Sequence, residues 1–270
     1  NPIKYCGAIP HFVDVEKETL GIDPIKLENY LKKITIKKKN YFINKNTKRK
    51  ISALIVMHTF GHASKILKLR NICKKYNLKL IEDSAEGIGS FYKKKHIGTF
   101  GDVGIFSFNG NKTITSGCGG AIVTNSLKLY KMIKHLSTQA KINHQFEFIH
   151  NQLGYNYRIS NLNAAVGYAQ LKYINKILLS KRKLNLVYND IFKNNYAFDV
   201  FNESIDCKSN YWLQTIILKK KYMKYKNKIL INLNQKNIKA RPVWKPIHSL
   251  VFYKNTPKMN LSNTNLLYKF

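Results

Sequence analysis

Lys112 stands in the segment FSFNGNKTITSGCGG, residues 106–120, between a β-like run and a cluster of glycines. A phosphate-binding P-loop requires one glycine directly before its lysine and another five residues before that glycine. Those two positions hold Asn111 and Phe106. The segment is therefore not a P-loop, and the role of Lys112 must follow from the side chains that the fold brings to it.

Two further side chains of reactive type end predicted strands. Asp83 ends LKLIED, residues 78–83, and Ser107 ends the strand that leads into the lysine loop. Open α/β sheets place their ligands at such strand ends. A lysine that binds an aldehyde, a carboxylate that pairs with a pyridine nitrogen and a hydroxyl that holds a phosphate would together suit pyridoxal phosphate. Taken alone, the aspartate also fits a turn, and the lysine also fits a solvated surface.

The elements around these residues indicate an α/β fold. The run ISALIVMHT, residues 51–59, is continuously apolar, which predicts a strand buried on both faces of a parallel sheet. A helix and then the strand LKLIED follow it, so the three elements predict a βαβ crossover. The apolar face of that helix carries Ile66, Leu69, Ile72 and Cys73.

The flanking regions complete the predicted organisation. HFVDVE at 11–16 alternates like a strand, and Asp23 and Pro24 can begin a helix that runs to about Leu31. The lysine- and asparagine-rich stretch 32–50 predicts a surface excursion. Helices are predicted from Ser126 and over 161–192, and then a strand at 211–218 and a helix near 223–236. We expect a large domain over residues 1–180 and a small C-terminal α/β domain over 181–270.

The composition limits the class of protein. The net charge of +33 would suggest a nucleic-acid partner, but the lysines are spread along the chain, as in proteins from AT-rich genomes. The longest apolar stretch is far too short to cross a bilayer. The four cysteines form no CxxC pair, and neither a disulfide framework nor a metal site follows from their spacing. His58 and His62 flank a buried turn without a third ligand nearby in sequence, and the thiols suit a reducing cytosol.

Two long segments resemble the DegT/DnrJ/EryC1/StrS family of sugar-nucleotide aminotransferases, which have pyridoxal-phosphate fold type I. These segments are IEDSAEGIGSFYKKKHIGTFGDVGIFSFNGNKTITSGCGGAIVTN at 81–125 and LGYNYRISNLNAAVGYAQL at 153–171. Three segments are most similar to the branch that makes legionaminic acid precursors, with bacillosamine-type C4 aminotransferases as near relatives: STQAKINHQFEFIHNQLGYNYR, SNYWL and ARPVWKPIH. The resemblance implies a mostly parallel sheet flanked by helices and a smaller C-terminal domain.

The resemblance also assigns roles around the cofactor. Lys112 would be the Schiff-base lysine, and Asp83 would pair with the pyridine nitrogen. Glu86 takes a place near the ring where many relatives have glutamine, and Ser107 would bind the cofactor phosphate. Cys118 stands where relatives have glycine or glutamate, which should alter packing rather than chemistry. The family builds its sites across a dimer interface, so two residues would reach the phosphate of the neighbouring subunit: Asn156 and Arg158.

Residues specific to the branch are candidates for substrate contacts. Four of them would contact the sugar and pyrophosphate: Lys141, His144, Glu147 and His150. The alternative is that these four are surface residues without a role in binding. Three residues of the C-terminal portion, Trp244, Lys245 and His248, could close over the substrate. Family members begin well before the first residue of this chain and end after its last. We therefore expect it to lack the start of the large domain, including part of the phosphate cup, and the end of the small one.

The implied activity is amino transfer from L-glutamate, through pyridoxal phosphate, to C4 of a nucleotide-linked 4-keto-6-deoxy sugar. The substrate would be of the UDP- or GDP-4-keto-6-deoxy-N-acetylglucosamine type, used for surface glycans or nonulosonic acids by a cytoplasmic homodimer. A 3-keto sugar aminotransferase is the first alternative. A sugar 3-dehydratase is disfavoured because the dehydratases carry histidine at the position of Lys112. A regulatory or nucleic-acid-associated protein is the remote alternative. No metal, membrane or specific nucleic acid is expected as a partner.

Overall fold

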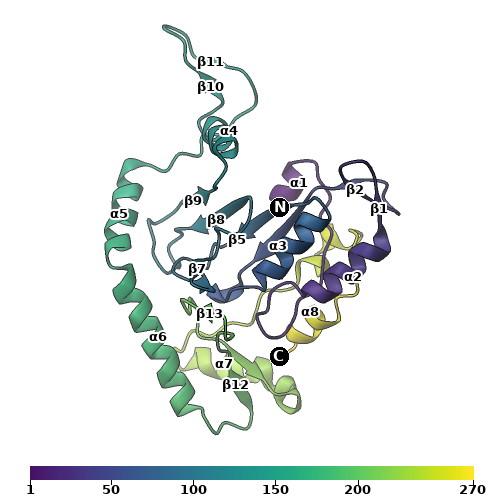
Figure 1. The fold of residues 1–270 in the computed structure, drawn as a ribbon. Coiled ribbons are helices and arrows are strands. Elements are labelled where there is room, and N and C mark those ends of the chain that lie inside the picture. Colours follow the sequence, from purple (N-terminus) through teal and green to yellow (C-terminus); the bar gives the residue numbers. More distant parts are fainter.

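The principal sheet of the molecule contains four strands. The computed structural model describes residues 1–270 and has an α/β architecture (Figure 1). The strand order of this sheet is β4-β5-β8-β9. Its strands are β4 (Ala53–Met57), β5 (Lys79–Asp83), β8 (Val103–Ser107) and β9 (Gly120–Val123). The first three are parallel and β9 returns antiparallel to β8, which confirms the predicted mostly parallel sheet.

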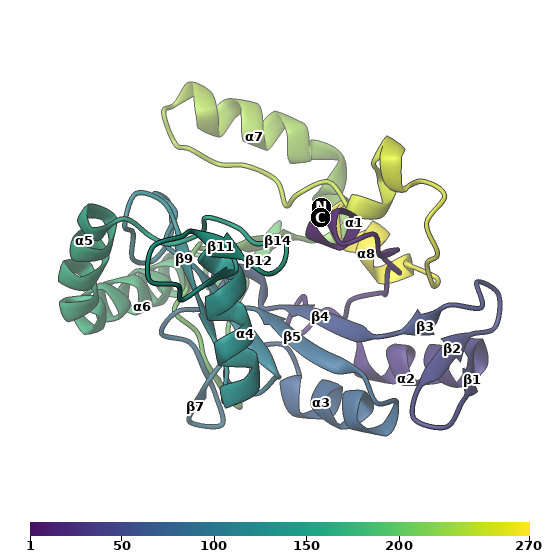
Figure 2. The same cartoon turned by 90° about the horizontal axis from the view of Figure 1, so that it is seen from above.

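The two faces of this sheet differ in burial. Leu54 and Val56 are buried on the face that packs against α3 (Ile66–Lys75). Ile55 and Met57, on the opposite face, are 42% and 36% exposed. The prediction that this run is buried on both faces is therefore wrong for this chain. The C-terminal helices α7 (Lys226–Gln235) and α8 (Ser262–Leu267) lie on that side of the sheet (Figure 2). Ile55 and Met57 nevertheless remain exposed.

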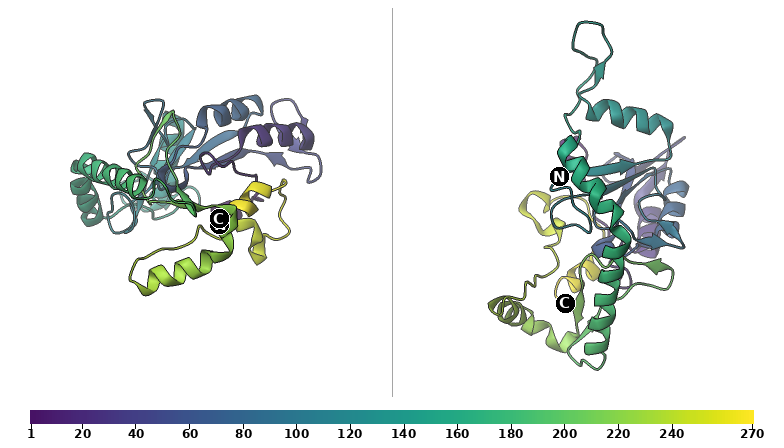
Figure 3. Two further views of the ribbon diagram at one scale, coloured as in Figure 1. Left: turned by 90° about the horizontal axis from the view of Figure 1, so that it is seen from below. Right: turned by 90° about the vertical axis from the view of Figure 1, so that its left-hand side faces the viewer.

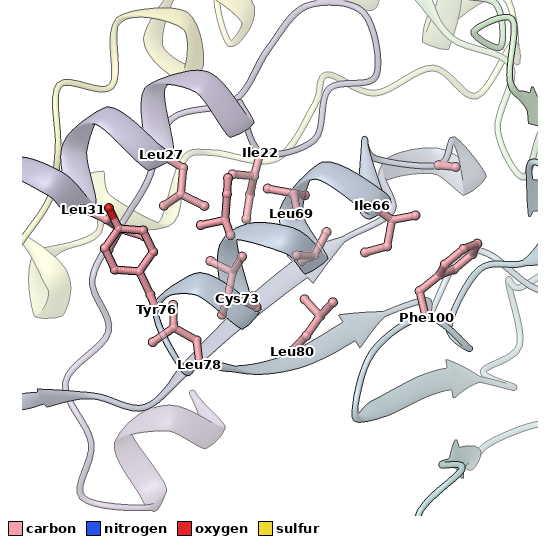
Figure 4. Close-up of a cluster of buried hydrophobic side chains, with 14 of the residues drawn as sticks. Ile22, Leu27, Leu31, Ile66, Leu69, Cys73, Tyr76, Leu78, Leu80 and Phe100 are labelled. Atoms are coloured by element: carbon pink, nitrogen blue, oxygen red, sulfur yellow. The ribbon is translucent and has the colours of Figure 1, made fainter. Parts of the chain in front are cut away.

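The main hydrophobic core lies between the sheet and two helices, α3 and α2 (Pro24–Ile34) (Figure 4). Asp23 caps α2 as predicted, since its carboxylate accepts the N–H groups of Ile25 and Lys26 at 2.9 and 3.0 Å. All four apolar side chains predicted for the face of α3 are buried. The βαβ crossover that ends at Asp83 is thus confirmed, and this packing fixes the strand ends that carry the candidate site.

One prediction near the N-terminus is wrong, and a second segment has more regular structure than its sequence indicates. Residues 11–16 form isolated bridges, Phe12 with Lys258 and Val15 with Ile22, rather than a strand. The stretch 32–50 lies mostly at the surface, as predicted, and contains most of a three-stranded antiparallel sheet of β1 (Thr35–Lys37), β2 (Phe42–Asn44) and β3 (Lys50–Ile51). Its anchor is the ring of Phe42, which packs against Tyr76 at 4.9 Å between centroids. Ile51 also packs against the main core and Asn44 is buried, so several contacts order this surface segment.

A hairpin and three helices follow the principal sheet. Ser126 caps α4 (Leu127–Ser137), and the hairpin of β10 (Lys141–Ile142) and β11 (Ile149–His150) projects beyond it (Figure 3). The helix predicted over 161–192 is two helices, α5 (Asn161–Lys172) and α6 (Ile174–Ile191), which meet at Tyr173. Residue 180, the predicted domain boundary, lies inside α6. The division into two domains therefore stays a prediction.

The C-terminal portion is only partly regular. β12 (Phe198–Val200) pairs with β14 (Ile216–Leu218), so just the end of the strand predicted over 211–218 is formed. The strand cannot begin at Tyr211, whose φ is +46°. The sheet of β6 (Phe91–Tyr92) and β7 (Lys95–His96) takes β13 (Cys207–Lys208) as its third strand. Through β13, the C-terminal portion of the chain thereby pairs with β6 of the N-terminal portion.

The remaining elements are short. They are α1 (Pro2–Tyr5) and the 3-10 helices η1 (Thr59–Gly61), η2 (Lys220–Tyr225), η3 (Ile247–Ser249) and η4 (Val251–Tyr253). The helix predicted near 223–236 is confirmed as α7, with η2 leading into it. No helix in the chain combines the length and apolar character that a membrane span requires.

Candidate active site

Lys112 lies in the loop that joins β8 to β9 at the end of the principal sheet. The N–H of Phe108 donates to the carbonyl of Gly119 at 2.9 Å, and the N–H of Ser116 donates to the carbonyl of Phe108 at 3.0 Å. Gly119 has a φ of +95°, a conformation that side chains with a Cβ disfavour. The loop is therefore closed at its base, and its tip presents Lys112 to the interior.

The Lys112 amine has two partners, one acidic and one aromatic. Its Nζ is 3.6 Å from Oε1 of Glu86 and 4.2 Å from the ring centroid of Trp212. The lysine side chain is only 13% exposed. The chain has 47 lysines and arginines, and such side chains are mostly exposed unless they are paired. The burial of Lys112 therefore points to a specific role. The structure thus brings Lys112 and Glu86, both of them candidate cofactor residues, together.

Glu86 is buried beside the lysine, and its other oxygen accepts the N–H of Phe60 at 2.7 Å. Burial raises the pKa of the Glu86 carboxyl above its ordinary value. The Phe60 N–H and the charge of Lys112 oppose that rise in the pKa, while the charge of Asp83 adds to it. A carboxyl that holds its proton more readily than usual can exchange one with the neighbouring amine.

Asp83 ends β5 on the open face of the sheet, in register with Met57 of β4 and Ile105 of β8. Its Oδ1 accepts the N–H of Ala85 at 3.1 Å, and the carboxylate forms no ion pair within the chain. A carboxylate at a strand end with no cation of its own is available to a cationic ligand group. This availability is what the predicted partner of a ring nitrogen requires.

A buried pair beneath the same strand fixes its position. Nε2 of His58 lies 3.0 Å from Oε2 of Glu82, and both side chains are fully buried. Burial raises the pKa of the Glu82 carboxyl, but the hydrogen bond and charge of His58 and the N–H groups of Gly98 and Gly101 outweigh it, so the net shift is downward. Because Glu82 precedes Asp83 on β5, this network holds the strand end rigidly.

Ser107 and the two predicted phosphate residues lie in different places. Ser107 ends β8, and its Oγ accepts the N–H of Asn109 at 3.3 Å, so the hydroxyl sits at the base of the lysine loop. Asn156 is exposed in the segment after the β10–β11 hairpin, where it bridges to Thr138. Arg158 is exposed two residues later. Within one chain the last two are not brought to Lys112.

The substrate residues predicted between 141 and 150 lie on the projecting hairpin of β10 and β11 (Figure 1). Lys141 lies over the ring of Phe148 at 3.8 Å from Nζ to the centroid. His144 accepts the N–H of Glu147 at 3.0 Å, and Nδ1 of His150 is 2.8 Å from the carbonyl of Gln139. These contacts are local to the hairpin. One chain alone does not place them at the lysine.

The C-terminal candidates are divided between two places. Trp244 stacks on Phe60, with centroids 5.4 Å apart, and on Trp212, with centroids 6.4 Å apart. It therefore lies one ring away from Lys112. His248 lies near Phe12 instead, with centroids 6.4 Å apart. Lys245 is exposed beside Trp244 in sequence, and no contact of its side chain supports a role.

Sequence reasoning missed the residues that join these loops. Asn210 is fully buried, and its amide nitrogen donates to the carbonyls of Glu86 and Ile88 at 2.7 and 2.9 Å and to the Thr113 hydroxyl at 3.2 Å. Trp212 covers the lysine. Both lie in SNYWL, a segment that was notable in the sequence only as a branch marker. A buried amide between three loops has no periodic signal that would have revealed it.

A separate buried histidine has no hydrogen-bond partner. Both ring nitrogens of His62 are unpaired, and its ring makes edge contacts with Phe201 and Tyr211. Burial lowers the pKa of His62 from its ordinary 6.5 to about 4, although the charge of Glu203 opposes the fall. The folded state therefore binds this proton less readily than the unfolded chain does.

This depressed pKa predicts acid sensitivity. The contribution of neutral His62 to the free energy of unfolding is fully present above pH 6.5 and is lost as the pH falls toward 4. For a pKa shift of this size the loss is about 3 kcal/mol. His62→Phe keeps the aromatic packing but cannot titrate. Between pH 6.5 and pH 4 we expect its free energy of unfolding to fall by about 3 kcal/mol less than that of the wild type. Urea unfolding at several pH values measures the difference. An equal fall in the free energy of unfolding of the two proteins between pH 6.5 and pH 4 would contradict the prediction.

Comparison with known proteins identifies the family. The profile of the DegT/DnrJ/EryC1/StrS aminotransferase family matches residues 1–269. The chain therefore belongs to that family.

Individual relatives support the assignment. The chain is 37% identical over 255 residues to the GDP-perosamine synthase of Vibrio cholerae. The matched region covers 94% of this chain and 65% of that protein. It is 30% identical over 271 residues to the UDP-4-amino-4,6-dideoxy-N-acetyl-beta-L-altrosamine transaminase of Campylobacter jejuni, covering all of this chain and 68% of the relative. The chain thus spans about two thirds of the length of these proteins.

A solved structure agrees with the fold. PseC of Helicobacter pylori, an aminotransferase involved in the biosynthesis of pseudoaminic acid, superposes with a TM-score of 0.87 at 28% identity, covering 99% of this chain and 68% of that one. The predicted family and its fold type I architecture are confirmed. Family membership also makes pyridoxal phosphate the cofactor.

The residues present fit this cofactor. A sparsely exposed amine at Lys112 can bond an aldehyde, the unpaired carboxylate of Asp83 can take a ring nitrogen, and the Ser107 hydroxyl stands at the strand end for a phosphate. The charges of both Lys112 and Asp83 act on the pKa of the Glu86 carboxyl. These groups are of the chemical types that the aldehyde, the ring nitrogen and the phosphate of the cofactor need.

Proposed function

We propose that the whole protein transfers an amino group from L-glutamate to C4 of a nucleotide-linked 4-keto-6-deoxy sugar. The observation that carries the proposal is the Lys112 amine held beside Glu86 at the end of a sheet that presents Asp83. The named relatives act on or make GDP-linked and UDP-linked sugars, which supports a nucleotide sugar as the amino acceptor.

Each residue of the site would have a separate task. The cofactor supplies an aldehyde that takes up the amino group and a ring that withdraws negative charge from the reacting carbon. Lys112 Nζ holds the cofactor and, once free, moves a proton to or from that carbon. Asp83 keeps a proton on the ring nitrogen, and Ser107 binds the phosphate. Glu86, 3.6 Å from Lys112, keeps the free amine in place.

We place the second half of the site on another copy of the chain. Large apolar side chains along the hairpin and α5 are exposed, including Phe146 at 81%, Leu153 at 84% and Leu162 at 82%. Patches of this kind mark protein interfaces. Five candidate residues are exposed in the same part of the chain: Lys141, His144, His150, Asn156 and Arg158. A homodimer would cover the patch and bring these residues to Lys112 of the partner.

The proposed product is an amino sugar for a surface glycan, made in the cytoplasm where nucleotide sugars are available. The segments STQAKINHQFEFIHNQLGYNYR and SNYWL favour a legionaminic acid precursor, and a GDP-linked sugar is the first to test because of the Vibrio relative.

The test is direct. The full-length protein is given L-glutamate and, in parallel, GDP- and UDP-linked 4-keto-6-deoxy sugars with and without an N-acetyl group. Mass spectrometry and NMR then identify the amino sugar and its configuration at C4. Amination at C3, or no amination of any 4-keto sugar, would reject the proposal.

Asp83→Asn should retain bound cofactor but lose at least about tenfold in kcat, because an amide cannot hold a proton on the ring nitrogen and charge-assisted contacts contribute about 1.5–3 kcal/mol. Steady-state kinetics of the full-length variant measure the loss, with absorbance of the bound cofactor as the control for binding. Turnover close to that of the wild type would make Asp83 merely structural.

A further inference from the structure

The aromatic partner of Lys112 has no role in the function proposed above. We propose that Trp212 is a positioning residue, whose indole face holds the Lys112 ammonium beside Glu86 whenever this amine is not bonded to the cofactor. The inference rests on the proposed function for its catalytic meaning. The contact itself can be tested without it.

The geometry is that of a desolvated cation–π pair. Lys112 Nζ is 4.2 Å from the centroid of Trp212, well inside the roughly 6 Å over which such pairs attract. Trp212 is buried, and the lysine side chain is 13% exposed. Glu86 approaches the same amine at 3.6 Å. The charge thus lies between a carboxylate and a ring face with little water, where both attractions are strongest.

Trp212 is fixed to the loop that carries its cation. The indole N–H donates to the carbonyl of Asn111 at 2.7 Å, and Asn111 directly precedes Lys112. The ring of Trp244 lies almost parallel to that of Trp212, with centroids 6.4 Å apart and an interplanar angle of 8°. One side chain therefore holds both the backbone before the lysine and the tip of the lysine side chain.

A brace behind Trp212 fixes the ring in turn. The backbone N–H of Trp212 donates to Oδ1 of Asn210 at 2.8 Å, and the Asn210 amide nitrogen bonds the 86–88 and 113 loops. A Cβ on Gly61 would stand 1.8 Å from Asn210 Oδ1, so only glycine fits there. The segment 209–212 is consequently locked among three loops, and Trp212 cannot turn away.

The chemistry explains why such a platform is useful. The amine must leave the cofactor in each half-reaction, carry a proton, and return to the same atom. A lysine tip that is free in solvent would lose rotamer entropy each time it returned. Holding it on a fixed ring face keeps it within reach. An exposed pair elsewhere is the contrast: Lys172 lies over Tyr168 at 4.9 Å on the surface of α5.

The test measures the reactivity of each lysine in the full-length protein prepared without cofactor. Brief competitive acetylation with isotopic acetic anhydride, followed by peptide mapping, gives the relative labelling rate of Lys112 in the wild type, Trp212→Phe and Trp212→Leu. We expect Trp212→Leu to raise this rate about tenfold, and Trp212→Phe, which retains a ring face, only about two- to threefold. Lys172 in the same digest is the internal control and should not change.

The pair of variants separates the ring face from the anchor. Both lose the hydrogen bond to Asn111, so equal rates in Trp212→Phe and Trp212→Leu would overturn the proposal, as would no change in either. Should Trp212→Leu not fold, fluorescence decides. Lys112→Met should increase the emission of the otherwise wild-type protein and leave that of the Trp212→Phe protein unaltered; equal changes in both would overturn the proposal.

The catalytic part has its own readout. In the full-length enzyme, Trp212→Leu should lower kcat more than Trp212→Phe does while leaving the KM for the sugar within about twofold, because the ring contacts the lysine rather than the substrate. Equal kcat losses in the two variants would overturn the positioning role. If the acetylation pattern holds but reduction with borohydride fixes no cofactor on Lys112, the proposed function fails while the Trp212 contact stands.

Discussion

Lys112→Arg is expected to lower kcat of the full-length protein by at least about 10³-fold, within the range for losing a general acid–base group, even though the positive charge is retained. The guanidinium cannot bond the cofactor aldehyde, and it does not release a proton near neutral pH. It should still lie beside Glu86, so the fold should tolerate the change. The loss would therefore report chemistry rather than packing.

Covalent mapping accompanies the kinetics. Borohydride reduction of the wild-type protein should fix the cofactor on the peptide that contains Lys112, and the same treatment of Lys112→Arg should fix none there. Lys128→Arg, at an exposed position on α4, is the matched control and should behave as the wild type. Label on a different lysine, or full turnover by Lys112→Arg, would refute the assignment of this residue.

The residues around Lys112 divide into those that the sequence could predict and those that it could not. Asp83, Glu86, Ser107 and Lys112 lie within 30 residues of one another, at the ends of strands whose apolar pattern is local. Strand periodicity therefore predicts a common end of the sheet for Asp83, Ser107 and the lysine loop, whereas the place of Glu86 was implied only by the family resemblance. Trp212 comes from a segment about a hundred residues away and reaches Lys112 only because Asn210 is locked among three loops. Such packing leaves no local trace in sequence.

The errors in the fold have a related cause. The run at 51–59 has the composition of a strand buried on both faces, but burial depends on what packs there, and Ile55 and Met57 remain exposed in this chain. The stretch 32–50 lies at the surface as predicted, but contacts of Phe42 and Ile51 with the main core give it a small sheet that its composition does not indicate. In both segments, partners remote in sequence decided the outcome.

The net charge of +33 and the exposed apolar patch make opposite predictions about assembly. Charge alone favours monomers that bind polyanions. Dispersed surface lysines are screened over roughly 8 Å in physiological salt, whereas an obligate interface often buries more than about 2,000 Å² of largely apolar surface. The dimer should therefore form, and the charge should remain visible only as weak, salt-sensitive binding of nucleic acid without sequence preference.

Mixing two inactive variants tests whether the dimer shares its active sites. Lys112→Ala and Asn156→Ala should each be inactive alone. After subunit exchange in equal amounts, half of the dimers are mixed and each has one intact site, so activity should return to about one quarter of the wild-type value. The intact site combines Lys112 of one chain with Asn156 of the other.

Two controls make this result decisive. Sedimentation at moderate salt must first show a dimer, and differently tagged subunits must be shown to exchange by co-purification. A mixture of Lys112→Ala with Asp83→Asn should regain no activity, because those two residues lie on the same chain at neighbouring strand ends and a mixed dimer then has no complete site. Recovery in that mixture would show that the sites are not composed as proposed. No recovery with Asn156→Ala despite exchange would place Asn156, and the hairpin surface beside it, outside the active site.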